Sequence, residues 1–262
     1  MLPTISIIWM LAACGGDAAS DKGGQGDDSA APDEIIETGG FALAASVVGP
    51  DGAPSPESGL CAAAVDLSGA AWGNPSPAIL AEAPVSGDGD VLLEIASVPS
   101  GATLGIGILI EACGEEAVMP TLSPIPATAW AWAGPGDTVL GLQAFVYTFA
   151  DVAALQGELA ASGFGGDLAT EGFLAGTLVN EQGLALNDCW VRGPAGTASW
   201  YDQGEATWVA NEGTQDEGGA RYVVPSPPFG SYLGRGAARD FPPFLGAGFP
   251  GYAERVDYAP ID

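Results

Sequence analysis

Short apolar stretches interrupted by turn-forming residues are the feature that most limits the fold of this chain. Beyond the first 38 residues, hydrophobic and polar positions alternate over a few residues and are then broken by Gly, Pro, Asn or Asp. The sequence contains 40 glycines and 21 prolines. Period-two alternation between frequent turn signals is typical of antiparallel β-strands. We therefore predict an all-β fold.

Two parts of the sequence repeat each other. Residues 88–104 and 217–233 align without a gap as an acidic turn with glycine, an alternating strand, a proline–glycine turn and a further strand. The stretches that begin at Gly40-Phe41 and at Gly172-Phe173 also correspond. At about 100 residues a unit, this duplication is longer than solenoid repeats of roughly 20–50 residues. It predicts two tandem domains.

A single helix is predicted between the repeats. Val152, Leu155 and Leu159 recur at three- and four-residue spacing, Asp151 precedes them as a suitable N-cap, and Gly163 follows as a terminator. We expect this helix to connect the two β-domains.

The first residues indicate export and lipid attachment. Residues 1–13 form an apolar run too short for the roughly 20 residues that span a bilayer. The sequence Leu11-Ala12-Ala13-Cys14 resembles the lipobox of bacterial lipoproteins, which implies cleavage before Cys14 and acylation of Cys14. By resemblance to bacterial sorting rules, Gly15 after the cysteine favours the outer membrane. The resemblance predicts a lipid-anchored protein of the bacterial cell envelope.

An acidic spacer follows the predicted lipid site. Residues 15–38 contain seven acidic residues and one lysine among Gly, Ser and Ala, without apolar periodicity. This composition predicts a disordered tether. The expected organisation is a signal peptide at 1–13, an acidic tether at 14–38, β-sandwiches at 39–150 and 167–262, and the connecting helix and linker at 151–166.

Charge and composition exclude several function classes. The chain has 33 Asp and Glu residues against six Lys and Arg residues, a formal net charge of −27. Such a chain repels nucleic acid. It contains no histidine, which excludes Ser-His-Asp and Cys-His nucleophile pairs and the common histidine metal sites. We predict no cofactor and no enzymatic activity.

The second repeat resembles a known domain family. Residues 176–191 resemble the first two strands of carboxypeptidase-regulatory-like (transthyretin-like) domains, and the family's later motif corresponds to Tyr222, Val224, Pro227, Pro228, Gly230 and Tyr232. The resemblance implies two tandem antiparallel β-sandwiches joined by a short helix. Turns at Gly52 and Gly183 fit this fold. The positions expected to face the core of the second sandwich are Leu178, Cys189, Val191, Tyr222 and Val224. Domains of this family are usually non-catalytic accessories.

The remaining cysteines allow one disulfide. With Cys14 assigned to the lipid, Cys61, Cys113 and Cys189 are left in an oxidising compartment. We favour a Cys61–Cys113 bridge because both residues fall in one predicted domain, and a Cys61–Cys189 bridge stays open. Cys189 is then expected to be a small buried residue.

Two groups of residues are weak candidates for ligand binding. Carboxylates that could hold a cation occur at equivalent turns, although turn formation alone explains them. These residues are Asp88, Asp90, Asp216 and Glu217. If their segment is a strand, Trp130 and Trp132 share one face of it and could stack on a sugar, whereas core packing is the usual role of tryptophan in a β-sandwich.

The function predicted from these features is a non-catalytic structural or binding module on a lipid anchor. Its partners would be the membrane, through the anchor, and envelope proteins or glycans. The alternative is a glycan-binding or glycan-active surface protein that uses exposed tryptophans and carboxylates.

Overall fold

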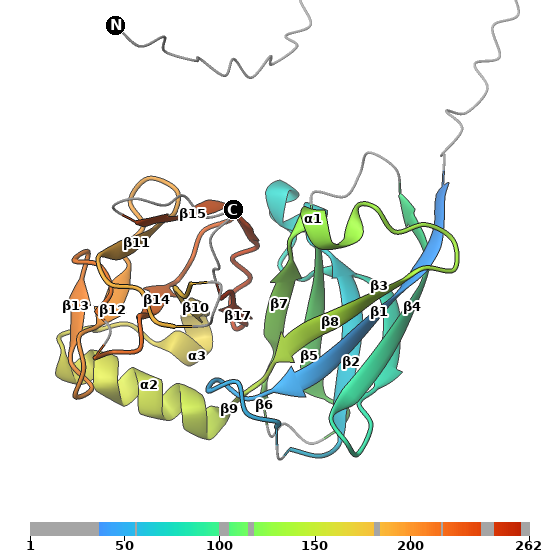
Figure 1. Ribbon diagram of the computed structural model, residues 1–262. Coiled ribbons are helices and arrows are strands. Elements are labelled where there is room, and N and C mark those ends of the chain that lie inside the picture. The colour runs from blue at the N-terminus through green and yellow to red at the C-terminus, as the bar shows by residue number, and fades with distance from the viewer. Residues whose placement is uncertain are drawn as a thin grey trace, which may run out of the picture. The chain divides into compact units, whose positions relative to one another are not determined.

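The computed structural model describes residues 37–55, 57–99, 105–114, 118–180, 184–215, 217–236 and 244–257 (Figure 1). The predicted signal peptide, Cys14, most of the predicted tether, Gly183 and Asp216 lie outside these residues. In the described part, strands β1–β17 predominate over three α-helices and one 3₁₀ helix. The all-β prediction is confirmed.

The first half of the body is built from two facing sheets. A three-stranded sheet has the order β4-β1-β8, and β3, β2, β5 and β7 follow one another in the other sheet. The strands are β1 (Glu37–Val48), β2 (Leu60–Asp66), β3 (Ala78–Pro84), β4 (Asp90–Pro99), β5 (Ile106–Ala112), β7 (Thr121–Ile125) and β8 (Thr138–Phe145). Alternate residues of β1, Phe41, Leu43, Ala45 and Val47, are buried between the sheets. Their period of two is that of a strand with one face in the core.

The second half is also built from two sheets, with shorter strands. One sheet contains β13, β12, β14, β10 and β17 in that order, and the other has the order β11-β15-β16. The strands are β10 (Phe173–Thr177), β11 (Cys189–Arg192), β12 (Trp200–Asp202), β13 (Trp208–Ala210), β14 (Arg221–Pro225), β15 (Gly230–Gly236), β16 (Phe244–Gly246) and β17 (Ala253–Arg255). The five positions predicted for this core, Leu178, Cys189, Val191, Tyr222 and Val224, are all buried in it.

The two halves repeat one pairing scheme. Strand β1 pairs antiparallel with β4 and parallel with β8, just as β10 pairs antiparallel with β14 and parallel with β17. In the facing sheets, β5 lies between β2 and β7, and β15 lies between β11 and β16. Strands that correspond in sequence therefore have corresponding neighbours.

The strand register corrects one detail of the sequence alignment. Phe41 pairs with Ile95 and Leu174 pairs with Val224, so Leu174 and not Phe173 is the counterpart of Phe41. Phe173 packs in a different cluster from Leu174. Because side chains alternate between the faces of a strand, a one-residue shift exchanges the buried set for the opposite face.

Three strand pairs in the described part are parallel, where the sequence analysis expected antiparallel pairing throughout. Two of them, β1 with β8 and β10 with β17, are equivalent. The third joins β17 to β7 through the pairs Ala253–Thr121 and Glu254–Leu122, so the two halves share one nine-stranded sheet. Close approach of the backbone at β17 requires Gly176, since a Cβ there would collide with the carbonyl oxygen of Val256.

The predicted connecting helix is present, with a different first turn. Helix α2 (Phe149–Ala161) buries Val152 and Leu159, as its apolar spacing predicted. Its N-cap is Thr148 and not Asp151. The Thr148 hydroxyl accepts from the backbone N–H of Asp151, and the Asp151 carboxylate accepts from the backbone N–H of Thr148 at 2.8 Å. This capping box satisfies two N–H groups that otherwise lack intrahelical partners.

Small elements complete the described fold. They are the 3₁₀ helix η1 (Ser68–Trp72), the strands β6 (Val118–Met119) and β9 (Tyr147–Thr148), and the helices α1 (Ala127–Trp130) and α3 (Leu168–Glu171). A disulfide joins Cys61 of β2 to Cys113, which follows β5, with the Cα atoms 5.1 Å apart. The structure thus has the bridge that the sequence analysis favoured, and Cys189 is buried in the core of the second half.

Candidate functional site

A small cavity lies where α2 covers the second half of the sheet. Its volume is about 190 Å³, and both Arg221 and Arg255 line it, together with Asp151, Glu158 and Trp208. The chain has only six basic residues. Two of these six basic residues meet here beside Asp151 and Glu158, so we take this cavity as the candidate site.

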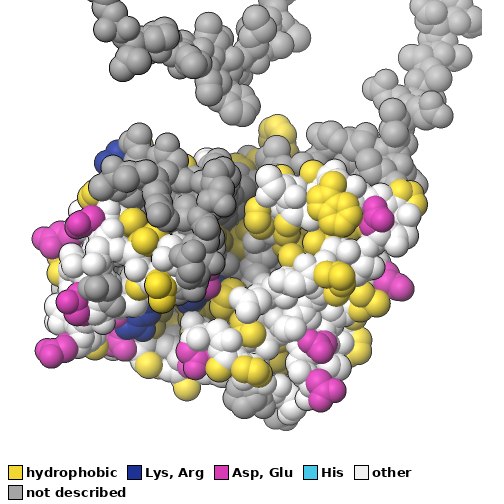
Figure 2. Space-filling view, in the orientation of Figure 1, with side chains coloured by type: hydrophobic (Ala, Val, Ile, Leu, Met, Phe, Trp, Pro, Cys, Tyr) yellow, Lys and Arg dark blue, Asp and Glu magenta, His cyan; other side chains and the backbone are white. Residues whose placement is uncertain are grey.

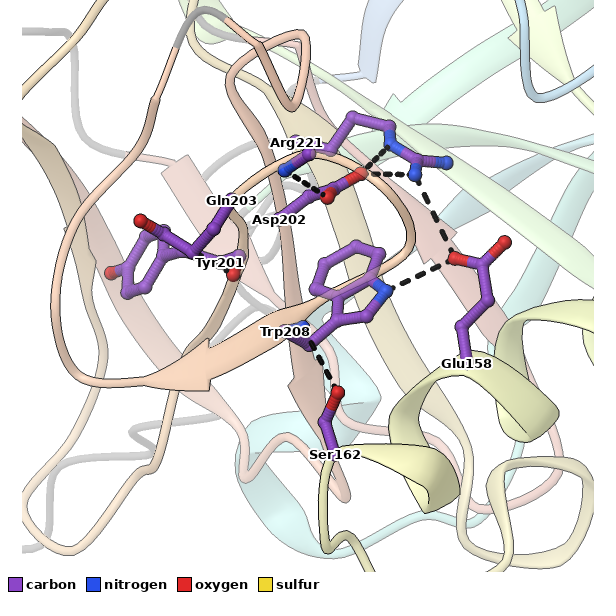
Figure 3. A network of polar contacts seen from close by, with 8 residues as sticks. Glu158, Ser162, Tyr201, Asp202, Gln203, Trp208 and Arg221 are labelled. Carbon is purple, nitrogen blue, oxygen red and sulfur yellow. Dashed lines mark hydrogen bonds and ion pairs between the residues drawn. The ribbon is translucent and has the colours of Figure 1, made fainter.

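Arg221 lies at the centre of the first polar network (Figure 3). Its Nε donates to Oδ2 of Asp202 at 2.8 Å, and its terminal nitrogen also pairs with this oxygen. The same nitrogen lies 3.6 Å from Oε2 of Glu158, on α2. Only 3% of the Asp202 side chain is exposed, compared with 45% for Arg221. Arg221 therefore neutralises a buried carboxylate and reaches out to the helix.

Trp208 connects the same network to α2. Its indole N–H donates to Oε2 of Glu158 at 3.0 Å, and its backbone N–H donates to the Ser162 hydroxyl at 3.0 Å. The guanidinium of Arg221 lies over the indole, 5.2 Å from the ring centre, a cation–π arrangement. These contacts join β13 and β14 to the helix that connects the two halves.

Arg255 forms the second network. Its Nε donates to Asp257 at 2.9 Å, another of its nitrogens donates to the Tyr147 hydroxyl at 3.1 Å, and the guanidinium lies over the ring of Phe145. Burial alone would lower the pKa of Arg255, but its interactions with Tyr147 and Asp257 raise this pKa overall. The guanidinium is therefore held in its charged form while it joins β17 to the end of the first half.

The chemistry of the cavity follows from these contacts. Both guanidiniums have carboxylate partners, so the arginines do not present an uncompensated positive charge to a ligand. The volume of about 190 Å³ is also below the roughly 300 Å³ at which ligand pockets usually begin. The two networks instead link strands to one another and to helix α2.

A buried carboxylate marks the strand shared by the two halves. Glu254 lies in β17, is 1% exposed, and accepts from the backbone N–H groups of Ala247 at 3.0 Å and Gly248 at 2.5 Å. Burial raises the pKa of Glu254 from about 4.5 to about 7, against the opposing effect of these donors. Glu254 thus holds the loop before β17 and titrates near neutral pH.

This pKa shift predicts that Glu254 makes the stability of the fold depend on pH, and that a single substitution removes this dependence. A carboxyl pKa that is higher in the folded than in the unfolded state adds stability below about pH 4.5, and this stability is lost as the pH rises through about 7. The shift corresponds to about 3 kcal/mol. Glu254→Gln cannot ionise, so we expect its free energy of unfolding, relative to wild type, to rise by that amount between pH 4.5 and pH 8. Urea titrations at both pH values measure this difference, and an equal difference at both would contradict it.

The acidic residues proposed as weak cation ligands do not form a cluster in the described part. Asp88 is exposed in the turn before β4, and Asp90 is exposed as the first residue of β4, where it accepts from the Ser46 hydroxyl at 2.8 Å. Glu217 is exposed in the turn before β14. Among the residues described, no group of three or more His, Cys, Asp or Glu side chains is placed to hold a metal ion.

The two candidate tryptophans do not share a strand face. Trp130 ends α1 and Trp132 follows it, so the strand that a shared face would require is not formed here. The Trp130 ring is partly buried and stacks on Phe41 with a centroid separation of 6.3 Å, whereas Trp132 is 61% exposed. Asp137 is the nearest acidic residue in the sequence, and its carboxylate accepts from the backbone N–H of Gly134.

Sequence reasoning missed Arg221, Arg255, Glu158 and Glu254. One signal was available for the arginines, because basic residues are rare in this chain and a rare cation among many acids is a natural partner for a buried carboxylate. No local pattern distinguished Glu158 or Glu254 from the other acidic residues.

Comparison with known proteins adds little. No family model and no curated protein matches the chain. Two similar solved structures are a streptococcal ancillary pilin and the full-length RrgB pilus protein of Streptococcus pneumoniae. The first is 10% identical, with a TM-score of 0.21, over 88% of this chain and 64% of the pilin. The second is 11% identical, with a TM-score of 0.18, over 88% of this chain and 48% of that protein. The chain thus spans less than two thirds of either, and TM-scores this low carry no information on function.

No helix in the described residues is both long enough and apolar enough to span a membrane.

Proposed function

We propose that the chain is a lipid-anchored protein of the bacterial envelope, and that its β-sandwich body is a non-catalytic structural or binding module. The observation that carries this proposal is the Cys61–Cys113 disulfide across β2 and β5. Disulfides form and persist in oxidising compartments outside the cytosol. A bridge of this kind agrees with the export implied by the lipobox-like Leu11-Ala12-Ala13-Cys14, with the outer membrane as the destination that Gly15 favours.

The proposed architecture is two carboxypeptidase-regulatory-like sandwiches behind an acidic tether. The domains occupy residues 39–150 and 167–262, with the helix and linker at 151–166 between them. Support comes from the pairing scheme that both halves share and from the five core positions predicted in the second half. Strand β1 begins at Glu37, two residues before the predicted start of the first domain.

The structural role is supported by what the charged groups of the candidate site do. Arg221 pairs with both Asp202 and Glu158, and the Trp208 indole donates to Glu158, so these contacts fasten the connecting helix to the second half. Arg255 with Tyr147 fastens β17 to the segment that leads into the helix. A body braced in this way suits a module that holds its shape at the cell surface.

Incorporation of a labelled fatty acid tests the anchor. In a bacterial host, we expect wild type to incorporate alkyne-tagged palmitate and Cys14→Ala to lose the label completely. Cys189→Ala is the matched control and is expected to keep the label, because its thiol is buried in the core. Separation of the membranes on a density gradient then assigns the labelled protein to one of them. An unlabelled wild type, or a label that survives Cys14→Ala, would refute the anchor.

A further inference from the structure

Two tryptophans in the first half are unusually exposed. Trp72, the last residue of η1, is 84% exposed, and Trp132, just after α1, is 61% exposed. An exposed apolar residue by itself is ordinary in soluble proteins. Two features distinguish these two indoles: their position in the fold and the absence of charge in the segments around them.

Both tryptophans lie at the same end of the first half. Strands β2 and β7 each pair antiparallel with β5, so they run in the same direction. Helix η1 follows β2 and helix α1 follows β7, which places both helices beyond the same strand ends (Figure 1). We call this the tryptophan end and define it as segments 67–77 and 126–136.

The chain that leads back to Cys14 enters the fold at the tryptophan end. The start of β1 is fixed there by a hydrogen bond from the N–H of Gly136 to the carbonyl of Gly40 and by the stacking of Trp130 on Phe41. The other end of β1 lies at the opposite side, where Ser46 pairs with Asp90. Whatever its conformation, the segment 15–36 can extend no further than about 75 Å.

Charged residues are unevenly distributed between the two ends of the first half. Segments 67–77 and 126–136 contain no charged residue, in a chain with 33 acidic residues. The acidic residues that flank them, Asp66 and Asp137, accept from the backbone N–H groups of Ser68 and Gly134. The opposite end holds Asp51, Glu57 and Asp88 in its connections and Asp90 at the start of β4. Figure 2 shows hydrophobic side chains gathered over α1 and the neighbouring sheet.

We propose that the tryptophan end rests on the lipid bilayer, with Trp72 and Trp132 in the headgroup region. Tryptophan favours this region because its ring is apolar and its N–H can still form a hydrogen bond. Anionic lipids would repel the opposite end more strongly than the tryptophan end, where Glu37 begins β1 but segments 67–77 and 126–136 carry no charge. The inference rests on the proposed anchor in one respect: an acylated Cys14 would keep the tryptophan end within about 75 Å of the membrane that carries the lipid.

Quenching of tryptophan fluorescence by brominated lipids tests the proposal. The full chain, purified from membranes, is incorporated into vesicles of phosphatidylethanolamine and phosphatidylglycerol with or without bromine on the acyl chains. We expect brominated vesicles to quench wild type, and the double variant Trp72→Ala/Trp132→Ala to lose that quenching. Trp9, where it is retained, contributes equally to both proteins and cancels in the comparison.

A matched control removes exposed apolar side chains elsewhere. Leu92 and Leu184 are 51% and 63% exposed and lie outside the tryptophan end. We expect Leu92→Ala/Leu184→Ala to be quenched as strongly as wild type. Thermal melts monitored by circular dichroism show whether both double variants are folded, as expected for substitutions of exposed side chains.

The outcomes separate this inference from the proposed anchor. Acylated wild type that is quenched no more than the tryptophan variant overturns the inference and leaves the anchor standing. Wild type that carries no acyl group refutes the anchor. If the quenching of this unacylated protein still depends on Trp72 and Trp132, the inference is supported. A change in tryptophan emission on adding cell-wall glycan fragments, without quenching by lipid, would assign this end to glycan and also overturn the inference.

Discussion

Removing the Cys61–Cys113 bridge is expected to lower the free energy of unfolding by about 4 kcal/mol. The bridge closes a loop between residues 52 positions apart, and the chain-entropy model gives this magnitude for a loop of that length. It also fixes β2 to β5, whose pairing continues to Cys113 through the N–H that donates to the carbonyl of Gly59. Urea titration of wild type and of Cys61→Ser/Cys113→Ser measures the loss.

Reductant supplies the control for this prediction. Dithiothreitol is expected to shift the unfolding midpoint of wild type towards that of the double variant and to leave the double variant unchanged. If the variant and wild type unfold at the same urea concentration, the bridge does not stabilise the fold and the prediction is wrong.

Replacing Arg221 with methionine is expected to destabilise the fold by about 3–5 kcal/mol, because the substitution leaves a buried carboxylate without its counter-charge. Asp202 is 2% exposed, and Arg221 is the cation in contact with it among the described residues. The same change removes the ion pair with Glu158 on α2. Urea titration of Arg221→Met at pH 7 measures the effect.

Two further variants identify the cause. Asp202→Asn added to Arg221→Met removes the buried charge, so we expect the double variant to regain part of the lost stability. Arg192→Met is the matched control, since the exposed side chain of Arg192 should change stability by no more than about 0.5 kcal/mol. A loss in Arg192→Met equal to that in Arg221→Met would show that general charge, and not the Asp202 pair, is responsible.

The parts of the fold that the sequence predicted depend on local patterns. Alternation places Cys189 with Val191 on one face of β11, and Tyr222 with Val224 on one face of β14, whatever these strands pair with. The apolar face of α2 is predictable for the same reason, because Val152 and Leu159 are two turns apart.

The parts that the sequence did not predict depend on choices between near-equal alternatives. Thr148 and Asp151 are both good N-caps, and the capping box uses Thr148 as the cap and Asp151 as its partner three residues later. Phe41 could align with Phe173 or with Leu174, and only the pairing with Ile95 and Val224 decides between them. The parallel pair of β17 with β7 joins segments more than 100 residues apart and has no local signal.

The candidate site was hidden for the same reason. Trp208 and Glu158 lie 50 residues apart, and Arg255 and Tyr147 lie 108 residues apart. Each of these residues on its own looks like an exposed charge or a core aromatic. Only the folded chain brings the rare arginines and their carboxylate partners together.

One mass measurement tests the central claim, that the protein is exported, acylated at Cys14 and bridged. The intact mass of the protein purified from bacterial membranes is expected to show loss of residues 1–13, acyl groups on Cys14, and two hydrogens fewer than the reduced chain because of the Cys61–Cys113 bridge. A full-length, unacylated mass with all thiols reduced would contradict both the envelope location and the lipid anchor.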